Sequence, residues 1–207
     1  MIDNSTKDKL ENETPHFGNT LLYAVADLKR YSTIVVDPPW EQKNMAKWKR
    51  RPNTAELLPY KTMSITEIEN LPLQKLADNN CHLWIWTTNQ FMPDAINLCK
   101  QWGFKYLSTI TWVKPSGVGA WFVNRTQHLI FGYKGKLKMN KRYLPTVYFD
   151  TPKRHSEKPE SFYELFESVS SENRLEMFAR REREGWDVFG NEVSNSIDLE
   201  RYHSNGI

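Results

Sequence analysis

Thr33-Ile34-Val35-Val36-Asp37-Pro38-Pro39-Trp40 is the stretch of this sequence on which the fold depends. Its apolar, β-branched run is typical of a strand buried on both faces, as found in parallel sheets. Pro38 and Pro39 end the strand, because proline has no backbone N–H for a sheet ladder and fixes its own φ. Ligands bind at the carboxyl edge of an open α/β sheet, so we predict an active site at Asp-Pro-Pro-Trp.

The tetrapeptide suits methyl transfer to an amino group conjugated with a ring, such as N6 of adenine. That nitrogen is a poor nucleophile, because its lone pair is delocalised into the purine. The Asp37 carboxylate and the Pro38 carbonyl can accept its two hydrogens and favour the pyramidal nitrogen of the transition state. Pro39 holds the turn rigid, and Trp40 offers a face on which an extruded base can stack. The alternative is a plain strand-ending turn with a solvated aspartate.

Length and composition favour a single α/β domain. The chain has 207 residues, of which 39% are hydrophobic, enough for one sizeable core. We expect a flexible arm over residues 1–19, the domain over 20–192 and a polar tail over 193–207. No apolar run reaches the length of a membrane span and no signal-peptide core opens the sequence. The expected location is the cytoplasm, or the nucleus in a eukaryote.

Cysteine and histidine usage gives no sign of a metal site. Cys81 and Cys99 are the two cysteines and the five histidines are scattered, without zinc-type spacing. We therefore predict no metal, and two buried free thiols.

Basic residues gather in two acid-free segments, although the whole chain balances 28 Lys and Arg against 25 Asp and Glu. Such segments suit a phosphate backbone, and an aromatic side chain among them could stack on a base. Solvated loops are the alternative interpretation. The candidate nucleic-acid contacts are Lys43, Lys47, Trp48, Lys49, Arg50 and Arg51 in the first segment, and Lys136, Lys138, Lys141 and Arg142 in the second.

Periodicity and capping signals predict alternating strands and helices. Ser64-x-x-Glu67 is a capping box that begins a helix, which Pro72 must kink or restart. We expect Asn89 to cap a second helix that Gly103 closes. Lys114-Pro115 should end a strand that begins at Tyr106. The other expected elements are strands at 81–87, 129–133, 147–149, 174–180 and 185–192, and a helix after Pro159. One helix between neighbouring strands indicates a doubly wound sheet.

With these segments in order, the chain resembles the MTA-type family, named for the seventy-kilodalton mRNA adenosine methyltransferase subunit. The resemblance runs from Tyr31 to Glu192. It rests on Asp37-Pro38-Pro39-Trp40, Pro59-Tyr60-x-Thr62-Met63-Ser64, Leu83-Trp84-Ile85-Trp86, Trp102-Gly103-Phe104, Trp112-Val113-Lys114, Arg154-His155-Ser156-x-Lys158-Pro159, Leu175-Glu176-Met177-Phe178-Ala179-Arg180 and Gly185-Trp186-x-x-x-Gly190-Asn191-Glu192.

The resemblance implies a Rossmann-like class I methyltransferase sheet, circularly permuted so that the catalytic strand precedes the cofactor strand, and S-adenosylmethionine as cofactor. Asp37, Pro38 and Trp40 match the catalytic tetrapeptide, and Tyr60 matches an aromatic of a gate loop. Lys158 matches a lysine near the cofactor and the reacting base, and Asp37 also lies at the cofactor. The implied cofactor contacts further along are Arg180, Asn191 and Glu192, with Glu182 a candidate acceptor for the ribose hydroxyls.

The same resemblance implies N6-adenine methylation of nucleic acid. Compact members of this kind look like stand-alone modifiers of microbial or viral genomes, so DNA is favoured over RNA. Three alternatives stay open: an RNA adenosine methyltransferase, a catalytically silent partner that holds nucleic acid for an active subunit, and a cytosine N4 methyltransferase. Assembly as a homo- or hetero-oligomer is also possible.

Overall fold

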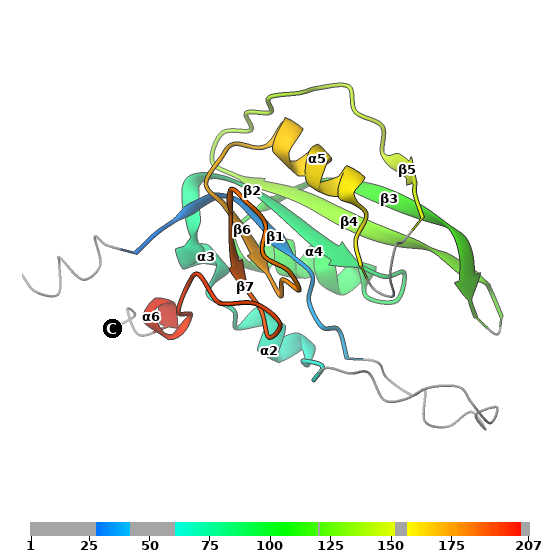
Figure 1. Ribbon diagram of the computed structural model, residues 1–207, viewed down its shortest axis with the longest axis horizontal. Helices are drawn as coiled ribbons and strands as arrows, with labels where there is room; N and C mark the ends of the chain where they lie inside the picture. The colour runs from blue at the N-terminus through cyan, green and yellow to red at the C-terminus, as the bar shows by residue number, and fades with distance from the viewer. Residues whose placement is uncertain (1–27, 42–60, 120, 152–156, 204–207) are drawn as a thin grey trace, which may run out of the picture.

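The computed structural model describes residues 28–41, 61–119, 121–151 and 157–203. A single mixed sheet organises this part of the chain (Figure 1). The elements, in chain order, are β1 (Tyr31–Val36), α2 (Ile65–Glu69), α3 (Leu73–Leu76), β2 (Ala77–Thr87), α4 (Met92–Gln101), β3 (Lys105–Val118), β4 (Asn124–Lys134), β5 (Val147–Phe149), α5 (Glu160–Val169), β6 (Arg174–Met177), β7 (Trp186–Phe189) and α6 (Glu200–His203).

Strand β1 lies inside the sheet, as its unbroken apolar run predicted. The strand order is β5-β3-β4-β2-β1-β6-β7. β1 pairs in parallel with β2, where Ile34 lies opposite Leu83, and with β6, where Ile34 lies opposite Leu175. The carboxyl ends of β1, β2, β6 and β7 therefore meet at one edge of the sheet.

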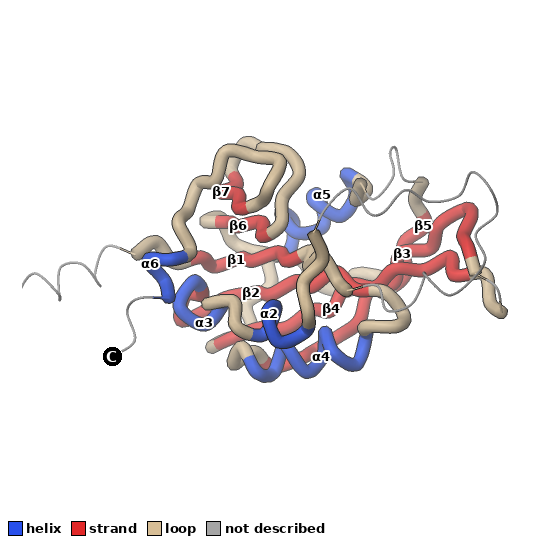
Figure 2. Tube along the Cα trace, turned by 90° about the horizontal axis from the view of Figure 1, so that it is seen from below, coloured by secondary structure: helices blue, strands red, loops and turns tan. Residues whose placement is uncertain are grey.

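The helices cover the two faces of the sheet. Figure 2 shows α2, α3 and α4 on one face and α5 on the other. Successive side chains of β1 point to opposite layers, so Ile34 and Val36 pack with the first group of helices while Val35 packs with α5. The predicted α/β fold with a Rossmann-like sheet flanked by helices is thus confirmed. Its circular permutation stays a prediction, consistent with β1 preceding its neighbour β6 in the chain.

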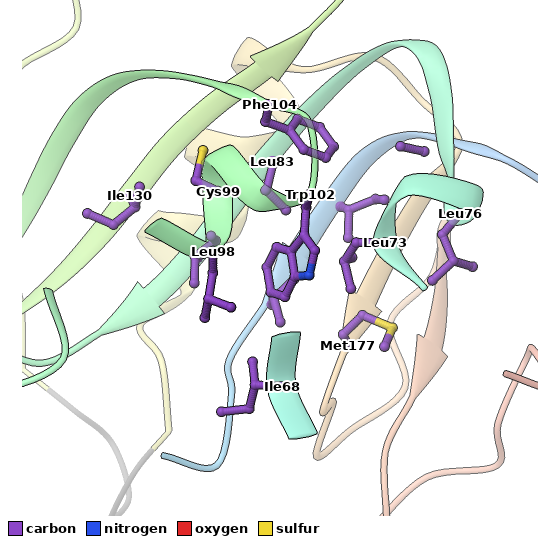
Figure 3. Close-up of a cluster of buried hydrophobic side chains, with 14 of the residues drawn as sticks. Ile68, Leu73, Leu76, Leu83, Leu98, Cys99, Trp102, Phe104, Ile130 and Met177 are labelled. Atoms are coloured by element: carbon purple, nitrogen blue, oxygen red, sulfur yellow. The ribbon is translucent and has the colours of Figure 1, made fainter. Parts of the chain in front are cut away.

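Trp102, directly after α4, lies in the middle of the core on the α2–α4 face (Figure 3). It is 2% exposed, and its Nε1 donates a hydrogen bond to the Glu69 carbonyl at 3.0 Å. The bond ties the end of α4 to the end of α2. The predicted capping box is present at Ser64 and Glu67, and the chain restarts as α3 after Pro72.

Two predictions about β3 and β4 are wrong. The two strands form an antiparallel hairpin with no helix between them, so the doubly wound pattern holds only for part of the sheet. β3 also continues through Lys114 and Pro115 to Val118. Proline is tolerated there because Pro115 lies past the segment of β3 that pairs with β5 and inside an irregularity of the β3–β4 register.

Asn89 does not cap α4, which begins at Met92 without a side-chain cap. Its amide instead bridges to β4: Oδ1 lies 2.7 Å from His128 Nε2, and Nδ2 donates to Thr126 Oγ1 at 3.0 Å. The predicted closing glycine is correct, since Gly103 has a φ of +80°.

The C-terminal segment contributes more to the core than a polar tail would. Tyr202 of α6 is 3% exposed, and Ile197 and Leu199 pack against the same core. The Tyr202 hydroxyl donates to the Lys29 carbonyl at 2.7 Å, which joins this segment to the residues before β1. Cys81 and Cys99 are buried free thiols, as predicted, and burial raises the pKa of the Cys99 thiol to about 11.

Replacing Gly132 with alanine should destabilise the fold, because α4 packs closely on β4 at this residue. A methyl group there would lie 2.4 Å from Cys99 Sγ. Overpacking of this kind costs about 1–3 kcal/mol of unfolding free energy. Denaturant unfolding measures the change, and the cost should fall in a Cys99→Ala background, where the sulfur is gone. An equal cost in both backgrounds would contradict this account.

Candidate active site

Asp37 and Lys158 form an ion pair at the carboxyl edge of the sheet. Lys158 Nζ lies 2.5 Å from Asp37 Oδ2, with 9% of the lysine side chain and 26% of the aspartate side chain exposed. Asp37 follows β1 directly, and its N–H donates to the Met177 carbonyl of β6 at 3.3 Å. Lys158 precedes Pro159, the N-cap of α5. The structure therefore brings together two predicted site residues that are far apart in the sequence.

Aromatic and cationic side chains surround Lys158. Its Nζ lies 5.1 Å from the ring centroid of Trp86 on β2, a favourable cation–π position. Lys114 of β3 is near enough that burial, and then the charge of Lys158, lower the pKa of its ammonium group. Two cations, Lys114 and Lys158, thus lie near each other at this edge of the sheet.

The rest of the tetrapeptide is held by backbone hydrogen bonds. The Pro38 carbonyl accepts from the Trp40 N–H at 2.8 Å, and the Pro39 carbonyl accepts from the Met63 N–H at 2.9 Å. The second bond secures the turn to the segment before α2. A carbonyl oxygen has two lone pairs, so Pro38 keeps the capacity to accept a further hydrogen.

Trp40 is buried, in contrast to the open stacking face predicted for it. Its side chain is 8% exposed. Phe91 stacks on the indole with a centroid distance of 5.2 Å and an interplanar angle of 11°. The indole Nε1 donates to the Trp86 carbonyl at 3.0 Å. Phe91 thus occupies a stacking position that was expected for the substrate base. In this structure, Trp40 fixes the turn that carries Asp37.

A buried carboxyl group beside the pair was missed by the sequence reasoning. Glu176 of β6 is 7% exposed and accepts a hydrogen bond from the Tyr163 hydroxyl at 2.8 Å. Burial raises its pKa and the charge of Asp37 adds to this, while Tyr163, Arg183 and Lys158 oppose it. The available signal was an acidic residue inside the apolar strand Leu175-Glu176-Met177.

Arginines 181 and 183 turn toward the start of α5. Arg183 makes a two-pronged bond to the Glu160 carboxylate, and its guanidinium lies 3.8 Å from the Tyr163 ring centroid. Arg181 also binds Glu160, at 2.8 Å. Hydrogen bonding from Arg183 is the main cause that lowers the pKa of Glu160 to about 2. Among the charged residues between Arg180 and Gly185, this leaves Glu182 as the better cofactor candidate.

An open hollow of about 560 Å³ lies beyond β6 and β7 and collects several predicted cofactor residues. It is lined by Glu182, Asn191, Glu192, Val193 and Ser194. Arg180 forms a long ion pair with Glu192, with Nε and Oε1 3.9 Å apart. Gly190 permits the close approach of the two strand ends, since a Cβ on it would lie 2.1 Å from the Ala179 carbonyl oxygen. The structure therefore groups Glu182, Asn191 and Glu192, as a cofactor site requires.

The second basic segment, residues 136–142, is attached to the core and exposes its basic side chains to solvent. Met139 and Leu144 pack on the core next to α5, and the Asn140 N–H donates to the Val169 carbonyl at 2.9 Å. Lys136, Lys138, Lys141 and Arg142 are all exposed.

Some predicted site residues lie outside the described residues, so their placement stays a prediction: Lys43, Lys47, Trp48, Lys49, Arg50, Arg51 and Tyr60. Within the described ranges, no cluster of His, Cys, Asp and Glu is arranged to hold a metal ion. No helix in those ranges is long and apolar enough to cross a membrane.

Together, the parallel strand ends, the paired Asp37 and the hollow beyond β6 and β7 define an α/β protein with a Rossmann-like sheet and a candidate site at its carboxyl edge. Comparison with known proteins makes the assignment specific. The chain belongs to the MT-A70 family, whose model matches residues 31–192.

Relatives in the family differ in how much of their length this chain spans. It is 26% identical over 197 residues to the type II methyltransferase M.MunI of Mycoplasma, with 83% of this chain and 82% of that protein covered. It is 27% identical to a putative N(6)-adenosine-methyltransferase MT-A70-like protein of Medicago truncatula, of which it spans 27%. Human METTL4, an N(6)-adenine-specific methyltransferase, is 28% identical over 189 residues, and this chain spans 38% of its length.

Glu176→Gln should flatten the decline of stability at rising pH. A carboxyl group whose native pKa is raised holds its proton longer in the folded than in the unfolded chain. Its stabilising contribution is therefore complete below the ordinary Glu pKa of about 4.3 and is lost as pH rises through the raised native value. Glutamine keeps an acceptor for Tyr163 but cannot ionise.

Denaturant unfolding at a series of pH values measures this effect. Glu164→Gln, at an exposed position of α5, is the matched control and should keep the parent pH profile. If the Glu176 variant also keeps that profile, ionisation of this buried group does not govern the decline.

Proposed function

We propose that this protein is an S-adenosylmethionine-dependent methyltransferase that modifies N6 of adenine in nucleic acid, with DNA favoured over RNA. One observation carries the proposal: the Asp37 carboxylate is fixed by Lys158 at the edge of the sheet to which the candidate cofactor hollow also belongs. Membership of the MT-A70 family supports the same reaction.

The hollow suits the nucleoside part of the cofactor. Glu182 and Glu192 supply carboxylates that can accept hydrogen bonds from two ribose hydroxyls, and the Asn191 amide can both donate to and accept from an adenine edge. Glu182 Oε1 is held by the Ser194 N–H at 3.3 Å. When bound, the cofactor supplies an electrophilic sulfonium methyl. Among the residues predicted for this role, Arg180 lies at the rim through its ion pair with Glu192.

Asp37 and Pro38 act on the amino group. A carboxylate accepts at about four lone-pair positions, so Asp37 can hold Lys158 on Oδ2 and still accept an amine hydrogen. The Pro38 carbonyl can accept the second hydrogen with its remaining lone pair. Both bonds strengthen as the nitrogen becomes pyramidal and more positive, which lowers the barrier to transfer. Lys158 keeps the carboxylate oriented, so it positions the catalytic residue.

The preference for DNA draws support from two relatives. M.MunI, a type II methyltransferase, is matched over most of both chains. METTL4 is named for the base adenine and not for the ribonucleoside adenosine. Of the relatives named as N(6)-adenosine-methyltransferases, human METTL3, at 25% identity, is spanned over 29% of its length, against 82% for M.MunI. RNA is the second candidate substrate.

Transfer of labelled methyl to matched double-stranded DNA, single-stranded DNA and RNA, followed by nucleoside analysis, tests the proposal. N6-methyladenine in one polymer supports the reaction and identifies the substrate. Detection of N4-methylcytosine would show that the substrate base is cytosine and not adenine. No product in any polymer, together with no binding of S-adenosylmethionine by calorimetry, would instead favour a silent partner of an active subunit.

Asp37→Asn should separate rate from cofactor binding. Asparagine keeps the shape of the side chain but presents only one oxygen and no charge, so turnover should fall by about 100-fold or more. The dissociation constant for S-adenosylmethionine should change little. Asn191→Ala, in the hollow, should do the reverse and weaken cofactor binding first. Equal losses of rate and affinity in both variants would contradict the division of roles.

Replacing Lys136, Lys138 and Lys141 with glutamine should weaken binding to nucleic acid and reduce its salt dependence. The slope of log affinity against log salt falls by about 0.9 for each lost contact with a duplex phosphate. Glutamine replacement of Arg30, Lys75 and Arg201, which are outside residues 95–149, is the matched control. An unchanged slope in the first variant would make the segment a solvated loop.

A further inference from the structure

Four exposed apolar side chains lie at the tip of the β3–β4 hairpin. Trp121 is 86% exposed, Phe122 and Val118 are each 83% exposed, and Val123 is 62% exposed. Figures 1 and 2 both show the hairpin running on past the end of β1, away from the helices. Large aromatic side chains that are exposed to solvent on a projecting hairpin indicate a binding surface.

The charge around this tip favours a polyanionic partner. The hairpin, residues 105–134, carries four basic residues and no aspartate or glutamate, and Lys114 and Arg125 are the basic residues nearest its tip. The chain as a whole has nearly balanced charge, with 28 basic and 25 acidic residues. A basic hairpin without acids attracts phosphates and has no side chain that repels them.

The hairpin passes the active site at Lys114. Lys114 Nζ of β3 lies 4.9 Å from the ring centroid of Trp112, which packs edge-on against Trp86 at 6.2 Å. The same Trp86 ring contacts Lys158 of the active site, at 5.1 Å. The Lys114 carbonyl accepts from Arg125 Nε of β4 at 3.0 Å. Val118 follows Lys114 by four residues on β3. At about 3.3 Å per residue, the tip lies roughly 13 Å along the ribbon from the active-site edge. That distance is about four base steps of a nucleic acid.

We propose that the hairpin tip is a base-binding element, in which Trp121 and Phe122 stack on or insert beside bases about four nucleotides from the reacting adenine. A two-stranded ribbon fits the major groove, and aromatic side chains bind bases of any sequence through stacking. The inference rests on the proposed function, because it assigns the nucleic-acid substrate to this surface. Val118 and Val123 complete the apolar contact.

Trp121→Ala/Phe122→Ala should weaken binding of a fluorescein-labelled DNA oligonucleotide by about tenfold or more, measured by anisotropy on single and double strands. The salt slope should not change, because no phosphate contact is removed. In the methylation assay, KM should rise while kcat at saturation stays near the parent value. Leu107→Ala, which removes exposed apolar surface at the opposite end of β3, is the control and should bind like the parent.

Binding is measured without turnover, so an inactive parent would overturn the proposed reaction and leave this test intact. Parent-like affinity of the double variant for DNA and for the matching RNA would overturn the proposal. A parent dimer that becomes monomeric in the double variant with unchanged affinity, measured by sedimentation, would also overturn it and make the tip an interface between copies.

Discussion

The parallel pairing of β1 on both of its edges is the constraint on which the rest of the structure depends. With β2 on one side and β6 on the other, β1 has no free edge, and its alternate side chains enter two separate cores. Its carboxyl end is therefore fixed in every direction. An acidic residue placed at that point keeps its position relative to both neighbouring strand ends, which a catalytic carboxylate requires.

The ion pair at this point joins the two layers of the molecule. Asp37 belongs to the sheet, and Lys158 begins the segment that leads into α5. Glu176, Tyr163 and Arg183 continue the polar contacts underneath, from the sheet through α5 to the loop after β6. Polar groups in such a network are costly to bury unless each is partnered. The site is thus built into the fold rather than attached to its surface.

The sequence predicted the elements whose signals are local. β1, the capping box at Ser64 and the restart after Pro72 follow from residue types next to one another. The contact between Asp37 and Lys158 was foreseen only as two separate matches to a family, because their proximity depends on tertiary structure. The continuation of β3 through Pro115 depends on where β5 stops pairing, and the burial of Trp40 depends on Phe91. Neither is visible in a local pattern.

Outside the acid-free stretch over residues 95–149, the part of the chain that the structure describes holds 10 basic and 19 acidic residues. Strands β3, β4 and β5 lie toward one end of the sheet order and β6 and β7 at the other, so this imbalance gives the described part of the molecule an electric dipole across the sheet. A polyanion exerts a torque on such a dipole before contact is made. The protein would therefore approach the polyanion with its hairpin side first. A larger fraction of collisions would have the productive orientation at low ionic strength, where screening is weak.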